Sequence, residues 1–364
     1  MRLSTTLSVY IGRQFTLWFA SVFLAFLGII LLFDFVELMR RASSKPDATP
    51  SVVMDMALLK LPQMAQEALP FVILLCSMVT FWRLTRSNEL VVVRGAGVSV
   101  WQFLLPALVI ALLVGVFKIA VFNPVASVMQ SRYEQMESKY LRGRSSLLAV
   151  SSSGLWLREA DSYGQSVVHA TRVLPQEFEL QEVTIFLFEG TDRFVGRIDA
   201  ATARLEDGYW RLSQAWLTGP DRPARFEPEY MVRTTLTPER IQNSFASPES
   251  ISFWDLPESI ALLENAGFSA LRHRLYWHSL LADPLLLCAM VLIAATFTLR
   301  PARRHGTLIL VGGGVFSGFL LYFVSDVFLA LGLSSSIPVV LAAWTPAGAG
   351  TLLGLSMLFH LEDG

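Results

Sequence analysis

Long uncharged runs, separated by short charged segments, dominate the hydropathy pattern of the chain. Six apolar runs lie at residues 14–33, 65–83, 98–122, 276–299, 306–331 and 338–360. A helix crosses the core of a bilayer with about 20 apolar residues, and each run is near that length. The pattern therefore predicts six transmembrane helices. The first run is too long and too aromatic for a signal-peptide core, so we expect it to be retained.

The composition agrees with a membrane protein. Hydrophobic residues make up 53% of the chain and charged residues only 16%, against about 25% charged in soluble domains. The net charge of −1 says nothing about nucleic acid, and the sequence has no basic tract that would indicate nucleic-acid binding. Cys76 and Cys288 both lie in apolar runs, which does not favour a disulfide framework.

The segment 123–272 differs from the apolar runs on either side. It is polar and rich in β-branched and aromatic residues, and Asp207-Gly208 is a typical hairpin turn. Short strands are expected at 154–158, 166–173, 182–188, 209–215 and 230–236. Such regularly spaced strands predict an all-β jelly roll or sandwich. After them, 248–267 resembles a loop leading into a short amphipathic helix.

The predicted fold is therefore α-helical in the membrane with one all-β domain. Residues 1–122 carry helices one to three, 123–272 the β domain, and 273–364 helices four to six. The inner face of the sheet has three interpretations from sequence: an ordinary core, a surface that accepts acyl chains, or an edge that adds a strand from a neighbouring domain.

Arginine and lysine in the short loops predict the orientation. One side carries Arg2, Arg13, Arg83, Arg86, Arg94, Arg300, Arg303 and Arg304. The other side carries only Arg40, Arg41, Lys45 and Lys60. The positive-inside bias makes the first side cytoplasmic, so both termini are inside. The β domain then faces outward, into a bacterial periplasm.

The outward-facing cluster of Arg40, Arg41 and Lys45 breaks the positive-inside bias. These residues are either interfacial cations that snorkel to lipid headgroups or a docking site for an anionic lipid from the outer leaflet. Asp34 and Lys118 lie near predicted helix ends, which favours snorkelling for both. Asp326 lies near the outer end of the fifth run and Asp283 about two turns into the fourth, and Asp326 is a candidate to face a cavity.

Catalytic and metal-binding motifs are absent from the sequence. It contains no phosphate-binding Gly-x-x-x-x-Gly-Lys-[Ser/Thr] loop, no His-Glu-x-x-His motif and no Gly-x-Ser-x-Gly elbow, and its five histidines are scattered. We therefore predict a non-catalytic chain without a metal site or cofactor of its own, so any energy that its function requires must come from a partner.

Residues 83–97 contain three arginines, an amphipathic segment and a Gly-Ala-Gly end. A short helix over about 85–97, lying across the cytoplasmic face, is the element on which a soluble motor could act. The stretch 86–97, Arg-Ser-Asn-Glu-Leu-Val-Val-Val-Arg-Gly-Ala-Gly, resembles the coupling-helix signature of the lipopolysaccharide-export permeases of the LptF/LptG family.

The resemblance spans the chain. It includes Phe35-Val36-Glu37-Leu38-Met39-Arg40-Arg41, Gly154-Leu155-Trp156, Trp210-Arg211-Leu212-Ser213-Gln214, Arg272-His273-Arg274-Leu275 and Ile337-Pro338. The Trp-Arg-Leu-Ser-Gln segment and the two arginines are more similar to the LptG type than to the LptF type.

The resemblance implies a permease subunit that extracts lipopolysaccharide from the outer leaflet of the inner membrane. The implied partners are an LptF-like sister permease, an LptB-like ATPase dimer that binds ATP and Mg²⁺, and an LptC-like bitopic protein. Glu89 is expected to pair with a basic residue in the ATPase groove, flanked by Arg86 and Arg94. A solvated helix-capping glutamate is the alternative.

The resemblance also implies where lipid binds. Arg40 and Arg41, with Lys45 nearby, match a basic pair that holds lipid phosphates. Asp34 departs from the family, because some members carry a basic residue there, and an acid repels phosphate unless it is paired or bridged by a cation. The expected acyl-chain cavity is lined by Phe26, Leu27, Ile30, Phe316, Phe319 and Phe323, although these side chains could equally face lipid.

Other classes remain as alternatives. An LptF-type sister subunit and a membrane-anchored assembly scaffold both explain the topology. A scaffold, however, does not account for the cytoplasmic segment that contains Glu89. A lipoprotein-releasing permease predicts four helices with its large domain after the first, whereas here that domain follows the third. An intramembrane enzyme lacks catalytic groups.

Overall fold

The computed structural model describes residues 5–43, 45, 48–87, 89, 95, 99–142, 147–151, 154–160, 165–174, 179–189, 193–206, 208–220, 222–234, 247–265, 269–299 and 307–363. Two compact units make up the chain. The helical unit consists of Met1–Tyr133, Glu249–Trp254 and Arg274–Gly364, and the β unit of Glu134–Pro248 and Asp255–His273.

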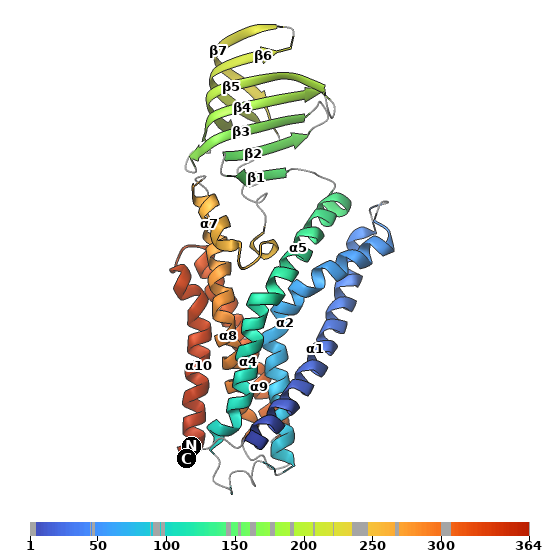
Figure 1. The fold of residues 1–364 in the computed structure, drawn as a ribbon, viewed down its shortest axis with the longest axis vertical. Helices are drawn as coiled ribbons and strands as arrows, with labels where there is room; N and C mark the ends of the chain where they lie inside the picture. Colours follow the sequence, from blue (N-terminus) through green and yellow to red (C-terminus); the bar gives the residue numbers. More distant parts are fainter. Residues whose placement is uncertain are drawn as a thin grey trace. The chain divides into compact units, whose positions relative to one another are not determined.

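Long helices form the helical unit (Figure 1). They are α1 (Thr5–Ala42), α2 (Pro50–Arg86), α4 (Val100–Phe117), α8 (Leu271–Thr298), α9 (Thr307–Leu333) and α10 (Val339–Asp363). The third continues without interruption through η1 (Lys118–Phe122), α5 (Asn123–Glu137) and η2 (Ser138–Arg142). Six helices among the described residues are long and apolar enough to cross a membrane, which confirms the predicted number.

The first three helices are longer than the apolar runs that predict them. The 38 residues of α1 extend about 57 Å at about 1.5 Å per residue, whereas a hydrocarbon core is about 30 Å thick. Apolar sequence therefore marks only the part that lipid surrounds. The predicted boundary of the β domain at residue 123 lies within the third helix, and the two units divide at Tyr133 and Glu134.

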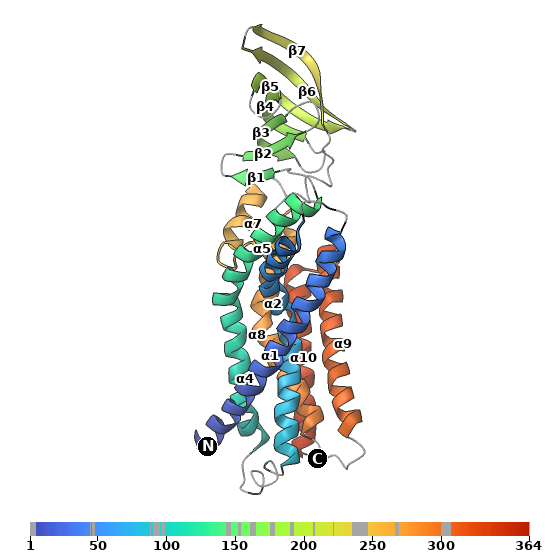
Figure 2. The same cartoon turned by 90° about the vertical axis from the view of Figure 1, so that its right-hand side faces the viewer.

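The core of the helical unit is formed mainly by α2, α4 and α8. Its fully buried side chains include Ile73, Phe81, Phe103, Leu104 and Met290. α1 packs against α2 and α4, while α9 packs against α10 and α2. Figure 2 shows α1 slanting across α2 and α4, with α9 and α10 side by side.

The β unit is a single antiparallel sheet. Its strands are β1 (Leu147–Ser151), β2 (Gly154–Ala160), β3 (Gln165–Leu174), β4 (Glu179–Glu189), β5 (Arg193–Glu206), β6 (Tyr209–Gly219) and β7 (Arg222–Arg233). They pair in sequence order, so the expected all-β domain is confirmed. The described strands follow each other as a meander, without the crossovers of a jelly roll. Gly208, between β5 and β6, has a φ of +83°, as the predicted hairpin turn requires.

A line of irregular residues crosses the middle of the sheet. On β4, β5 and β6 two residues, instead of one, separate successive buried side chains: Leu180 from Val183, Ala200 from Ala203, and Leu212 from Ala215. Glu182 and Gln214 on this line have positive φ values of 52° and 55°. An extra residue in a strand bends it and increases its twist. The bend keeps the apolar side chains on one face along the whole strand.

The predicted amphipathic helix is α7 (Leu256–Asn265). Its Ile260 and Leu263 join the apolar core on the inner side of the sheet, which includes Ile185, Trp210 and Leu212. The inner face of the described strands is therefore packed by side chains, as in an ordinary core.

Candidate functional site

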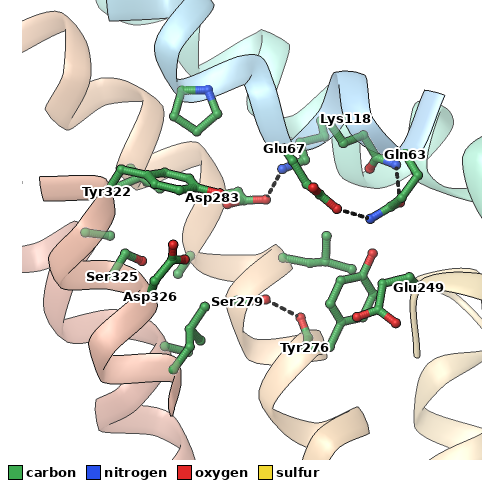
Figure 3. Close-up of a pocket in the computed structure, with 18 residues that line it drawn as sticks. Gln63, Glu67, Lys118, Glu249, Tyr276, Ser279, Asp283, Tyr322, Ser325 and Asp326 are labelled. Carbon is green, nitrogen blue, oxygen red and sulfur yellow. Dashed lines mark hydrogen bonds and ion pairs between the residues drawn. The ribbon is translucent and has the colours of Figure 1, made fainter. Parts of the chain in front are cut away.

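A polar cavity of about 180 Å³ lies inside the helical unit. Side chains of α2, α8, α9 and α10 surround it, together with Lys118 of η1 and Glu249 (Figure 3). Its ionisable residues are Glu67, Lys118, Glu249, Asp283 and Asp326, flanked by Gln63, Gln66, Tyr276, Ser279, Tyr322 and Ser325. The other lining residues are apolar: Pro70, Leu280, Ala282, Leu286, Leu329, Ala343 and Ala347.

An ion pair joins the third helix to α8 at the cavity wall. Lys118 Nζ donates to Asp283 Oδ2, and the two side chains are only 8% and 16% exposed. Snorkelling, the interpretation favoured for Lys118 from sequence, is therefore wrong: its charge is buried and paired inside the bundle. Charged groups at this depth usually pair with one another or face a cavity, and here both conditions are met.

Local backbone geometry brings the two partners together. Gly115 lies against Pro284, because a Cβ on Gly115 would come within 2.6 Å of the proline Cα. This close approach places the next turn of the third helix beside Asp283. That turn, η1, is a π-helix, a distortion that often occurs at functional sites.

A chain of amide hydrogen bonds extends from the cavity. Gln63 Nε2 donates to Glu67 Oε1 at 3.1 Å, and Gln66 Nε2 donates to Gln63 Oε1 at 3.2 Å. Asn123 Nδ2 then donates to Gln66 Oε1 at 3.5 Å and to the Tyr276 hydroxyl at 3.3 Å. Buried polar groups need hydrogen-bond partners. This series of hydrogen bonds provides them and connects α2, α5 and α8.

Carboxylates outnumber cations around the cavity. Four acids (Glu67, Glu249, Asp283 and Asp326) and one base (Lys118) line it. Both Asp283 and Asp326 line the cavity, a question that the sequence left open for both. Gln63, Gln66 and Glu67 were not identified as site residues from the sequence. Their spacing of three and four residues was a signal, because it places their side chains on one face of a helix. Among the described residues no three His, Cys, Asp or Glu side chains could together hold a metal ion.

A second buried ion pair involves Asp34 of α1. Lys60 Nζ of α2 donates to Asp34 Oδ1 at 2.5 Å, and the carboxylate side chain is 6% exposed. Snorkelling is therefore wrong for Asp34 as well. The same Lys60 ammonium lies 5.6 Å from the ring centroid of Tyr133. Asp34 is thus neutralised by a neighbouring helix.

The basic cluster at the end of α1 is exposed. Arg41 and Lys45 are exposed, and Arg40 is 76% exposed. The guanidinium of Arg40 forms a bidentate pair with Glu37, with distances of 2.9 Å and 2.8 Å to the two carboxylate oxygens. The guanidinium group of Arg40 is therefore already paired with a carboxylate, and a phosphate would have to compete with Glu37 for it.

The six side chains predicted for an acyl-chain cavity lie on two helices. Phe26, Leu27 and Ile30 of α1 are half-buried, whereas Phe316, Phe319 and Phe323 of α9 are exposed. None of them lines the polar cavity. Their role as an acyl-chain surface remains a prediction.

Only part of the predicted coupling helix is described. α2 ends at Arg86, whose guanidinium lies 5.1 Å from the ring centroid of Trp82. Glu89 is half-buried, and its Oε1 accepts a hydrogen bond of 2.8 Å from Ser87 Oγ. Arg94 and most of the predicted helix lie outside the described residues.

Comparison with known proteins covers both units. The family model for the lipopolysaccharide export system permease LptF/LptG matches residues 9–360. The chain is 27% identical over 360 residues to the lipopolysaccharide export system permease protein LptG of Escherichia coli K12, covering 96% of this chain and 97% of the relative. It is 22% identical over 369 residues to LptG of Haemophilus influenzae, covering 98% of each.

Proposed function

Because the chain belongs to the LptF/LptG family of lipopolysaccharide export permeases, we propose that it is the LptG-type subunit of an ATP-driven export complex. It is a permease subunit of lipopolysaccharide export and a multi-pass protein of the inner membrane. One observation carries the proposal: the family match extends over 9–360 and thus over all six membrane helices and the β unit.

The proposed topology has both termini in the cytoplasm and the β unit in the periplasm. The excess of arginine in the loops on the side of the termini supports it. In this orientation the chain takes lipopolysaccharide from the outer leaflet and passes it towards a periplasmic bridge to the outer membrane.

The energy for transport comes from partners in this proposal. The sequence has no phosphate-binding loop, so ATP and Mg²⁺ bind to an LptB-like ATPase dimer. An LptF-like sister permease completes the membrane part, and an LptC-like bitopic protein receives the lipid. Glu89, flanked by Arg86 and Arg94, is the proposed contact with the ATPase. A charge-assisted hydrogen bond is strong enough to carry such a mechanical link.

Lipid contacts are proposed at the end of α1 and along two apolar helix faces. Arg40, Arg41 and Lys45 would hold phosphates, while the aromatic faces of α1 and α9 would contact acyl chains. Asp34 need not repel phosphate, because Lys60 neutralises it at 2.5 Å. This pairing removes the difficulty that an acid in α1 poses for anionic lipid.

Reconstitution tests the proposed function. The chain is purified with its sister permease and ATPase, placed in proteoliposomes that contain lipopolysaccharide, and supplied with ATP and a soluble periplasmic acceptor. We expect ATP-dependent transfer of lipopolysaccharide to the acceptor, and no transfer with an ATPase that cannot hydrolyse ATP. A complex that assembles but transfers nothing would favour the scaffold alternative. Rescue of cells depleted of LptF, but not of LptG, would favour the sister-subunit alternative.

A further inference from the structure

A row of side chains in register crosses the outer face of the sheet. The Cα pairs Trp156–His169, His169–Thr184, Thr184–Asp199, Asp199–Trp216 and Trp216–Phe226 connect β2 to β7. Side chains that face each other across a sheet in this way lie on the same face. We call these six residues the cross-strand row.

The cross-strand row points away from the packed core. Its members alternate along their strands with fully buried residues: Trp156 lies between Leu155 and Leu157, and Trp216 follows Ala215. Trp156, Trp216 and Phe226 are themselves exposed. Exposed aromatic side chains that share one face of a sheet are candidates for a binding surface.

Aromatic groups lie at the two ends of the row. The ring centroids of Trp156 and His169 are 4.3 Å apart at one end, and those of Trp216 and Phe226 are 5.1 Å apart at the other. Four strand spacings separate β2 from β6, or about 19 Å at about 4.8 Å each. The row is thus long enough for an oligosaccharide and too long for a single sugar.

Hydrogen-bonding groups occupy the centre of the row. Thr184 Oγ1 donates to Asp199 Oδ1 at 2.8 Å, and Arg197 donates to the same oxygen through Nε at 2.9 Å and Nη2 at 2.6 Å. These three hydrogen bonds of the carboxylate all converge on Oδ1. Among the described residues no donor to Oδ2 is found, and the side chain is 38% exposed.

We propose that the cross-strand row, with Arg197, binds the saccharide part of the lipopolysaccharide that the complex exports. Sugars present C–H groups on their ring faces and hydroxyls at their edges. The negatively charged faces of tryptophan attract the former, and a fixed carboxylate and guanidinium match the latter. The packed inner face leaves the outer face for this ligand. The proposal rests on the proposed function, because it takes the substrate from it.

The test uses the full-length chain in nanodiscs and two probes. One probe is the fully deacylated oligosaccharide of a rough-type lipopolysaccharide, and the other is the intact lipopolysaccharide from which it is prepared. Binding is followed by the saturation-transfer difference signals of the sugar protons and by titration. The variants are Trp156→Ala with Trp216→Ala, the conservative pair Trp156→Phe with Trp216→Phe, and Asp199→Asn. Tyr209→Ala is the matched control, because Tyr209 is an exposed aromatic residue of β6 outside the row.

We expect saturable binding of the oligosaccharide to the parent chain. The double alanine variant should weaken it at least tenfold, Asp199→Asn by a smaller factor, and the phenylalanine pair should retain most of it. Tyr209→Ala should leave it unchanged. Circular dichroism and the melting temperature establish that each variant is folded. If the double alanine variant unfolds, Asp199→Asn still tests the proposal, because asparagine has nearly the same shape as aspartate.

Four results would overturn the proposal. The first is an unchanged affinity in the double alanine variant, and the second is an equal loss with Tyr209→Ala. The third is failure of the oligosaccharide to bind although intact lipopolysaccharide binds, which leaves the permease function in place. If a protein subunit of the complex covers the row and the double alanine variant loses that subunit instead of the sugar, the row is a protein interface. Failure of intact lipopolysaccharide to bind or be transferred would contradict the proposed function itself.

Discussion

Lys60 Nζ donates a hydrogen bond of 2.5 Å to Asp34 Oδ1, so that a lysine of α2 neutralises a nearly buried carboxylate of α1. Removal of either partner leaves the other charge without its counter-ion, which costs about 1–3 kcal/mol of stability. We expect Lys60→Met and Asp34→Ala each to lower the thermal unfolding midpoint in detergent. The double variant should be more stable than the sum of the two losses predicts, and strict additivity would contradict a direct coupling.

The pair of Lys118 and Asp283 is more deeply buried, and a larger effect is expected. Breaking a buried ion pair from one side typically costs about 3–5 kcal/mol. Lys118→Met should therefore reduce the yield of folded protein, and Lys118→Met with Asp283→Leu should restore much of it. Lys139→Ala serves as a control because Lys139 is exposed. Equal yields for the single and double variants would show that the ion pair does not matter for folding.

The contact between Gly115 and Pro284 should not tolerate a side chain. A Cβ at position 115 would lie 2.6 Å from the proline Cα, whereas nothing lies within 4 Å of a Cβ at Gly28. Overpacking typically costs about 1–3 kcal/mol, so Gly115→Ala should lower the unfolding midpoint. Gly28→Ala is the matched control in α1 and should leave it unchanged or raise it. Similar midpoints for both variants would contradict the close packing of the third helix against α8.

Glu89 is the proposed contact with the ATPase, and Glu89→Ala should uncouple hydrolysis from transport. In the reconstituted complex we expect the variant to insert normally while lipopolysaccharide transfer per ATP hydrolysed falls at least tenfold. Ser87→Ala removes the hydroxyl that donates to Glu89 and lies within hydrogen-bond distance of the Arg83 and Leu84 carbonyl oxygens, but it keeps the Glu89 carboxylate, so it should have a small effect. Full lipid-stimulated ATPase activity and transfer in Glu89→Ala would rule out the coupling role.

At the end of α1, one substitution should decrease the binding of lipopolysaccharide and another should increase it. Replacing Arg40 and Arg41 by alanine should reduce photocrosslinking of lipopolysaccharide to this end of α1 several-fold. Glu37→Gln should increase it, because Glu37 engages the Arg40 fork through two hydrogen bonds. Crosslinking yields are compared by mass spectrometry of the labelled peptide. An unchanged yield in the double alanine variant would leave both arginines as interfacial anchors.

Strand prediction shows where local sequence was insufficient. The expected strands at 154–158, 166–173, 182–188, 209–215 and 230–236 overlap β2, β3, β4, β6 and β7. β5 was missed although it has 14 residues, because its glycine, aspartate and alanine residues have low strand propensity. Pairing with β4 and β6 on both sides determines its conformation instead. β1 was missed as well.

The sequence by itself determined the six membrane helices, the intervening all-β domain and the turn at Gly208. These features depend on the hydropathy of continuous segments and on the backbone freedom of single residues, both of which are local properties. Only the tertiary structure decided the partners of Asp34 and Lys118, the set of residues around the polar cavity and the cross-strand row. Those groupings join side chains far apart in the chain, such as Lys118 and Asp283. Their proximity follows from helix packing and strand register, which no local pattern specifies.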